Sequence, residues 1–204
     1  MANQLIDAVT SPLPHIRTPR QLAEPIRRFD EAIERAFVPL RGRPLVDRTL
    51  YTASELGDHS LIWHVLATAR GLRRDGDLAG TVRIVSIMGI ESLVVNGFVK
   101  SLFRRQRPVH EGPRPHRLRT PLTSSFPSGH ASAAAVFTVV AGEDDPAAPA
   151  YAALAATIAA SRVHVRIHHP SDVVGGAAIG VALGVALRWW WPADRLLPRG
   201  LGRR

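Results

Sequence analysis

A chain of 204 residues is long enough for one domain, and no shift in composition along it indicates a second. Its 26 basic and 17 acidic residues give a formal net charge of +9, which suits nucleic acid, an anionic membrane surface or a phosphorylated substrate. The absence of cysteine excludes disulfides, thiol catalysis and cysteine-ligated zinc.

The N-terminal part divides into two segments. We expect residues 1–20 to be irregular because they are rich in proline, and they lack the charged start and apolar run of a cleaved signal peptide. In residues 21–40, apolar side chains recur every three or four positions opposite a face rich in arginine (Leu22, Ile26, Phe29, Ile33 and Phe37). This spacing predicts an amphipathic helix, which could lie along a membrane surface or pack on the rest of the protein.

Apolar segments separated by polar turns make up most of the remaining chain. The strictly apolar part of residues 49–72 is too short to cross a bilayer, which takes about 20 residues. Residues 80–103 are long enough, although four polar or charged residues interrupt them (Arg83, Glu91, Asn96 and Lys100). Residues 129–141 and 150–162 are small and apolar, with an acidic turn between them. This pattern predicts helices throughout.

The last apolar segment, residues 171–191, is the most typical of a membrane helix. Fifteen consecutive uncharged residues precede Arg188, and three tryptophans follow it, as in the aromatic belt at a membrane interface. Its glycines and alanines allow close packing of membrane helices. We predict an all-α fold, a membrane-embedded bundle of about 4–6 helices with an N-terminal amphipathic helix. A single helical domain would span residues 21–192, and a basic tail residues 193–204; a soluble helical bundle is the alternative.

Three blocks of polar residues carry the functional signal. The first has Lys100 and the pair Arg107-Pro108 separated by six residues, and the second is the run of residues 124–130, Ser-Ser-Phe-Pro-Ser-Gly-His. The third contains Ser161-Arg162, His168 and Asp172. In order and in internal spacing they resemble the three signature motifs of the type-2 phosphatidic acid phosphatase and vanadium haloperoxidase superfamily. One block could arise by chance, but all three in this order are specific.

The residue types also suit the chemistry of phosphate. A transferring phosphoryl group carries negative charge on its equatorial oxygens, so fixed cations accelerate its transfer. Lys100, Arg107 and Arg162 could supply three positive charges. The Ser128 hydroxyl and the free backbone N–H groups at a helix that begins at Gly129 could bind the same anion.

The resemblance implies a role for each remaining site residue. His168 would be the nucleophile that forms a phosphohistidine, and Asp172 would fix its tautomer. His130 would protonate the leaving alkoxide and then act as base on the hydrolytic water. No metal or other cofactor is expected, because arginine and lysine fill the place that magnesium takes in kinases. The pair Arg104-Arg105 could bind a headgroup or a second phosphate.

Each of these residues also has a structural interpretation. Arg162 and Lys100 could extend toward a membrane interface, and Arg166 is expected to do so. Asp172 would suit the first turn of any helix, and His130 could be an ordinary residue at a helix start. The functional interpretation depends on the three blocks occurring together.

The expected function is hydrolysis of a phosphomonoester or diphosphate on a lipid, such as a polyprenyl phosphate or phosphatidate. A vanadate-dependent haloperoxidase and a non-catalytic membrane protein are the alternatives. Expected partners are the lipid phosphate substrate and membrane lipid, but not nucleic acid, because basic and aromatic residues are not interleaved. The positive-inside rule predicts a multi-pass protein of the cell membrane with the site on the outer face, although the arginine-rich first 50 residues fit this orientation less well.

Overall fold

The computed structural model describes residues 19–109, 118 and 121–193. The prolines predicted to make the N-terminus irregular, apart from Pro19, and the basic tail after residue 193 lie outside the described residues. The described residues form helices and contain no strand, which confirms the predicted all-α class.

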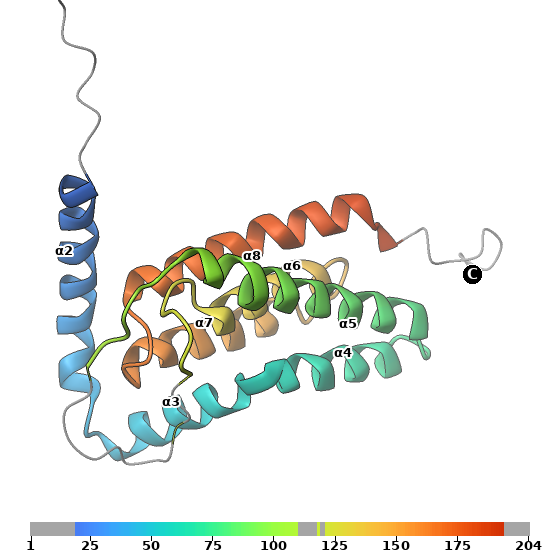
Figure 1. Cartoon of the computed structure of the whole chain (residues 1–204). Helices are drawn as coiled ribbons and strands as arrows, with labels where there is room; N and C mark the ends of the chain where they lie inside the picture. The colour runs from blue at the N-terminus through green and yellow to red at the C-terminus, as the bar shows by residue number, and fades with distance from the viewer. Residues whose placement is uncertain (1–18, 110–117, 119–120, 194–204) are drawn as a thin grey trace, which may run out of the picture.

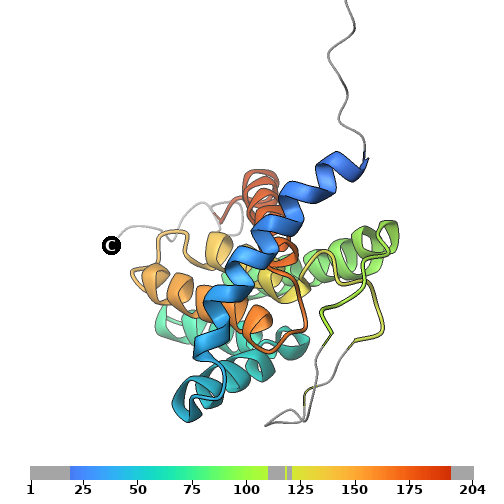
Figure 2. The ribbon, with the colours of Figure 1, turned by 90° about the vertical axis from the view of Figure 1, so that its left-hand side faces the viewer.

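Helix α2 (Pro19–Phe37) forms where the amphipathic pattern predicts a helix, and the short turn η1 (Val38–Leu40) follows it. It runs across one end of the bundle rather than along it, as Figures 1 and 2 show. One face of α2 contacts helices α7 (Ala148–His164) and α8 (Pro170–Trp190). Ile26 and Phe29 remain 47% and 42% exposed, so the helix packs on the bundle and still presents apolar surface.

The segment predicted over residues 49–72 is two helices, α3 (Pro44–Leu56) and α4 (Leu61–Arg73). The turn η2 (Asp58–Ser60) separates them, with φ of 54° at His59 and 57° at Ser60. A right-handed helix cannot continue through two left-handed residues, so the segment is divided here, and its strictly apolar part corresponds to α4. The break lies beside the candidate site.

Among the residues that the structure describes, two helical segments are long and apolar enough to cross a membrane. The first is Leu78–Leu102, made of α5 (Leu78–Ser92), the π-helical turn η3 (Leu93–Phe98) and the turn η4 (Val99–Leu102). The second is α8. Both lie within two residues of the predicted bounds, and α6 (Gly129–Ala141) is a shorter apolar helix with the predicted bounds.

Helix α6 is the centre of the bundle and contacts α5, α7 and α8. Its approach to α8 is close because α8 has glycine where the backbones meet. A Cβ atom on Gly176 would overlap the carbonyl oxygen of Ser128, which immediately precedes α6, and one on Gly180 would overlap that of Ser132 within α6. The prediction that the small residues of this segment allow close packing is therefore confirmed.

The turn at residues 74–77, the acidic turn after α6 and the C-terminal end of α8 meet at one end of the bundle. Arg73 binds Asp145 at 3.0 Å, Arg74 donates to the carbonyl of Asp144, and Arg83 donates to the carbonyl of Trp191. These contacts lie at the end opposite α2 (Figure 1). The segments that carry the three polar blocks lie at the other end, beside α2 (Figure 1).

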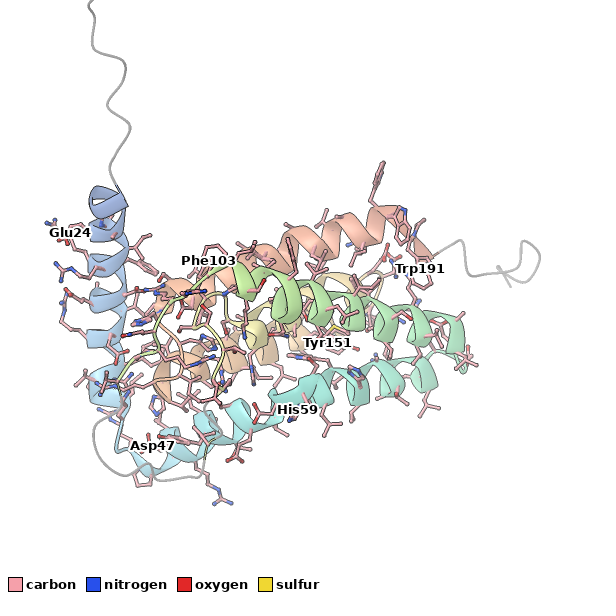
Figure 3. All side chains as sticks on the ribbon, viewed as in Figure 1. Glu24, Asp47, His59, Phe103, Tyr151 and Trp191 are labelled. Carbon is pink, nitrogen blue, oxygen red and sulfur yellow. The ribbon has the colours of Figure 1, made fainter. Side chains whose placement is uncertain are left out.

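The apolar core fills the middle of the bundle. The ring of Phe137 lies 4.9 Å from that of Trp63 and 5.2 Å from that of Tyr151, between centroids. Figure 3 shows Tyr151 inside the bundle, whereas Glu24 points away from it. Toward α2 the buried residues become polar, and several are almost fully enclosed (Ser125, Ser128, Arg162, His168 and Asp172). Burying a polar group costs free energy unless the group is hydrogen-bonded. Hydrogen bonds therefore determine the structure at this end of the bundle.

Candidate active site

His168 lies in the turn between α7 and α8, where the backbone of Arg162 fixes the chain. The carbonyl oxygen of Arg162 accepts hydrogen bonds from the backbone N–H groups of Ile167 and His168, at 3.2 and 3.1 Å. Arg166 turns the chain with a φ of 53°. The side chain of His168 is 2% exposed.

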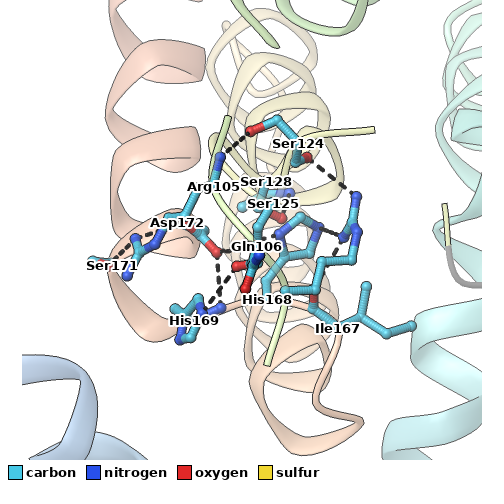
Figure 4. A network of polar contacts seen from close by, with 12 residues as sticks. Arg105, Gln106, Ser124, Ser125, Ser128, Ile167, His168, His169, Ser171 and Asp172 are labelled. Atoms are coloured by element: carbon cyan, nitrogen blue, oxygen red, sulfur yellow. Dashed lines mark hydrogen bonds and ion pairs between the residues drawn. The ribbon is translucent and has the colours of Figure 1, made fainter. Parts of the chain in front are cut away.

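Asp172 faces His168 from the first turn of α8. Its Oδ2 atom lies 3.7 Å from Nδ1 of His168, 2.5 Å from the Ser125 hydroxyl and 2.8 Å from the backbone N–H of His169. The other oxygen, Oδ1, accepts a 2.7 Å hydrogen bond from Arg105 (Figure 4). The carboxylate is fully buried and held on both oxygens, so its position relative to His168 is fixed.

Arg107 contacts the other ring nitrogen of His168. Its Nη1 atom lies 3.3 Å from Nε2 of His168, and its guanidinium donates to backbone carbonyls on both sides (Ile167, Pro121, Thr123 and Ser124). A guanidinium has no acceptor, so Nε2 must present its lone pair and the proton belongs on Nδ1, toward Asp172. Burial lowers the pKa of His168 to about 3, which keeps the ring neutral near pH 7.

The second block forms the start of α6. Ser128 is the N-cap of this helix, its side chain is fully buried, and its backbone N–H donates to the carbonyl of Asp172 at 3.0 Å. This bond joins the starts of α6 and α8. His130, in the first turn of α6, places Nε2 at 2.9 Å from Oδ1 of Asp58.

Arg162 and Lys100 approach from two further elements. Arg162, near the end of α7, is 2% exposed, and its guanidinium donates to the hydroxyl of Ser54 in α3. Lys100 lies in η4, just before the chain leaves the apolar segment. Both side chains face the cavity that His130 and His168 also line.

That cavity has a volume of about 920 Å³ and brings the three blocks together. Five of the predicted site residues line it (Lys100, Gly129, His130, Arg162 and His168). Three predicted residues lie behind this lining: Arg107 beside His168, and Ser128 and Asp172 fully buried. The structure therefore gathers all eight predicted residues around one cavity, from segments up to 72 positions apart.

Two residues of the site, Asp58 and Ser125, have no individual role in the sequence-based prediction, and Arg105 has a role that differs from the predicted one. Asp58 pairs with His130, and Arg105 and Ser125 both bind Asp172. Ser125 lies inside the second block, so its neighbours could have indicated it, whereas no local pattern distinguishes Asp58. Arg105 is engaged with carboxylates, so it is not the headgroup contact that was expected of it, and Arg166 pairs with Glu34 instead of extending to an interface.

Within the described ranges, no group of three or more His, Asp or Glu side chains is placed to hold a metal ion. The positive charge at the cavity comes from Lys100 and Arg162, with Arg107 behind His168. Such an arrangement suits a tetrahedral anion with three or more charged oxygens.

Two solved structures have the same fold. One is the transmembrane PAP2-type phosphatidylglycerolphosphate phosphatase from Bacillus subtilis, with a TM-score of 0.65, 24% identity and coverage of 91% of each chain. The other is LpxE from Aquifex aeolicus, with a TM-score of 0.61, 23% identity and coverage of 76% of this chain and 92% of that one. Because both identities are below 25%, the similarity to these structures shows the fold alone.

Sequence comparison adds the family. The chain is 31% identical over 158 residues to the decaprenylphosphoryl-5-phosphoribose phosphatase of Mycobacterium tuberculosis, covering 75% of this chain and 83% of the relative. It is 32% identical over 139 residues to the phosphatase of that name from Mycolicibacterium smegmatis, covering 67% and 74%. The family model of the PAP2 superfamily matches residues 80–196. The chain therefore belongs to the PAP2 superfamily and is a membrane phosphatase with the helical fold of that superfamily.

Proposed function

We propose that this PAP2 phosphatase removes phosphate from a lipid through a covalent phosphohistidine on His168, without a metal ion. One observation carries the proposal: His168 and His130 line a single cavity with Lys100 and Arg162. Two imidazoles and fixed cations around one space are what a two-step phosphoryl transfer needs.

In the first step, Nε2 of His168 attacks the phosphorus atom and the bond to the lipid oxygen breaks. The lipid oxygen takes a proton from His130 and leaves as an alcohol or a shorter phosphate. The Nδ1–H group of His168 stays directed at Asp172, whose negative charge stabilises the positive ring of the phosphohistidine. Arg162 and Lys100 bind the equatorial oxygens.

In the second step, water attacks the phosphohistidine and the nitrogen–phosphorus bond breaks. His130 accepts the proton from the water, so the residue that acted as acid now acts as base. Inorganic phosphate leaves, and the lone pair on Nε2 of His168 is restored. Each cycle returns both rings to their starting protonation.

Asp58 fits this scheme as the partner of His130. Its carboxylate accepts a hydrogen bond from Nε2 of His130, which leaves Nδ1 as the nitrogen that exchanges a proton with the substrate. A carboxylate beside the ring also stabilises the protonated form required in the first step. Asp58 therefore positions His130 as Asp172 positions His168.

A polyprenyl-linked sugar phosphate is the substrate class that the relatives support. The two relatives named above are decaprenylphosphoryl-5-phosphoribose phosphatases, and simple prenyl phosphates and phosphatidate share the same scissile group. Residues of α4 and of the membrane segment Leu78–Leu102 also line the cavity (His64, Met88, Gly89, Ser92 and Asn96). This lining supports access of a lipid from the side of the bundle.

The orientation proposed is that of a multi-pass protein with the cavity on the outer face. The turn containing Arg73 and Arg74 lies at the opposite end of the bundle, together with the C-terminal end of α8. Basic residues favour the cytoplasmic side of a membrane, so that end is assigned to the cytoplasm.

Phosphate release by the detergent-purified protein tests the proposal. The parent and His168→Ala are compared on decaprenyl phosphate, phosphatidate and a phosphorylated prenyl-linked sugar, each with and without EDTA. We expect EDTA to leave the parent rate unchanged and His168→Ala to lose about 10⁴-fold or more of it. Glu31→Gln is the control, because Glu31 is exposed on α2 and does not line the cavity of His168. A His168→Ala protein with the parent rate would exclude the mechanism.

A further inference from the structure

Helix α2 supplies a buried carboxylate to the start of α8. Asp30 is 7% exposed, and its Oδ1 atom accepts the backbone N–H of Ser171 at 2.7 Å. Its Oδ2 atom accepts the Ser171 hydroxyl at 2.9 Å and the Nη2 group of Arg105 at 2.6 Å. A side chain from α2 thus accepts hydrogen bonds from both the backbone N–H and the hydroxyl of Ser171, the residue immediately before Asp172.

Arg105 connects this carboxylate to the catalytic one. While Nη2 of Arg105 binds Asp30, Nη1 binds Oδ1 of Asp172 and the hydroxyl of Ser171, both at 2.7 Å (Figure 4). The backbone N–H of Arg105 also donates to the Ser124 hydroxyl at 3.2 Å. One guanidinium therefore lies between two carboxylates, and the chain of contacts runs from Asp30 through Arg105 and Asp172 to His168.

A second group of contacts joins α2 to the turn that carries His168. Glu34 of α2 binds Arg166 at 3.0 Å and Arg41 at 2.8 Å. Arg41 in turn donates to the carbonyls of His164 and Val163 at the end of α7, at 2.9 and 3.0 Å. The turn after α7 and the start of α8 are thus both attached to α2.

We infer that Asp30 is a positioning residue that acts through Arg105 on Asp172 and His168. Helix α2 is then part of the active site, although it lies outside residues 80–196 that match the family model. The inference rests on the proposed function of His168. A lone guanidinium against Asp172 would withdraw charge from the carboxylate that orients His168. Asp30 shares that guanidinium and holds it in place, and an unpaired buried charge remains when one partner is removed.

The substitution Asp30→Asn separates charge from shape. Asparagine keeps an oxygen for the backbone N–H of Ser171, so it can still cap α8, but it loses the negative charge that Arg105 binds. We expect kcat to fall about 10- to 100-fold with little change in KM, because displaced reacting groups slow the chemical step. Asp30→Glu, which keeps the charge, should recover most of the lost rate.

Glu24→Gln is the matched control on the same helix. Glu24 points away from the bundle (Figure 3), and it forms ion pairs with Arg27 and Arg28 of α2 itself. We expect it to keep the parent kcat. The unfolding temperature of each variant in detergent shows which rate changes come from loss of the folded state.

A double-mutant cycle with Arg105→Gln completes the test. If Asp30 acts through Arg105, Asp30→Asn lowers kcat in the parent but adds little in the Arg105→Gln background. Equal effects in both backgrounds, a change in KM alone, or an Asp30→Asn protein as active as Glu24→Gln would overturn the inference. Failure of the proposed function would give a different result. His168→Ala would then retain activity, independently of the effect of Asp30→Asn.

Discussion

The Nε2 atom of His130 lies 2.9 Å from the Oδ1 atom of Asp58, although 72 residues separate them along the chain. The turn η2 makes this contact possible. Gly57 leaves space for the ring of His130, and His59 and Ser60 adopt left-handed backbone conformations that end α3 and restart the chain as α4. Residues held in such conformations cost free energy, and they persist where the surrounding structure requires them.

Replacing Asp58 by asparagine should slow the enzyme without unfolding it. Asparagine can still accept the hydrogen bond of His130, but it cannot stabilise the protonated ring, so we expect kcat to fall about 10- to 100-fold. Steady-state rates on a lipid phosphate measure this. Glu55→Gln, on the exposed face of α3, is the control and should keep the parent rate. An unchanged kcat in Asp58→Asn would show that His130 works without this carboxylate.

Gly57→Ala tests the same contact from the other side. A Cβ atom at position 57 would lie 2.5 Å from Cδ2 of His130 and 3.0 Å from Cγ2 of Ile158. Its φ of −75° suits any residue, so the effect comes from crowding alone. We expect His130 to move and kcat to fall, with a loss of stability of about 1–3 kcal/mol from overpacking. Gly97→Ala, where a Cβ atom meets nothing within 4 Å, should change neither.

The bounds of the long helices could be predicted from the sequence because apolar runs and polar turns alternate clearly. Residues 80–103 and 171–191 agree with α5 to η4 and with α8 within two residues. The break at Gly57–Ser60 could not be predicted in this way, because Asp, His and Ser also occur inside helices. The contact between Asp58 and His130 is made at this break, and a tertiary contact of this kind leaves no signal in the local sequence.

The residues of the site also fall into two groups, those that the sequence alone indicates and those that only the structure reveals. Lys100, His130 and His168 belong to motifs with fixed spacing, so the sequence contains them as a pattern. Asp58 and Asp30 lie outside those motifs, on segments that reach the site through packing of α2 and α3 on the bundle. Contacts between distant segments leave no periodic signal in one sequence, and they become visible only in the structure.

Burial of His168 predicts a pH dependence of stability. The pKa of His168 is about 3 in the folded protein, whereas an unfolded histidine has a pKa near 6.5. Between these values the unfolded chain binds a proton that the folded protein does not, so the free energy of unfolding falls as pH decreases through this window. His168→Gln removes that difference. Its unfolding temperature in detergent should therefore fall less than that of the parent between about pH 7 and about pH 4.5. A parallel fall in both proteins would contradict the assignment.

Arg107 is expected to be irreplaceable by lysine, although both residues carry one positive charge. Its guanidinium donates to the carbonyls of Pro121, Ile167, Thr123 and Ser124 while Nη1 lies 3.3 Å from Nε2 of His168. A lysine ammonium has three donors on a flexible stem and cannot reproduce this planar set, so Arg107→Lys leaves backbone carbonyls unpaired and His168 less firmly held.

A lost hydrogen bond to a charged group is worth about 1.5–3 kcal/mol, which corresponds to a fall in kcat of about 10- to 100-fold. Steady-state rates and inhibition by orthovanadate, a phosphate analogue, measure the effect on turnover and on anion binding separately. Arg104→Lys is the neighbouring control, because Arg104 is exposed and belongs to none of the contacts around His168. If Arg107→Lys kept both the rate and the orthovanadate affinity of the parent, positive charge alone would suffice beside His168, and the forked geometry of the guanidinium would have no part in catalysis.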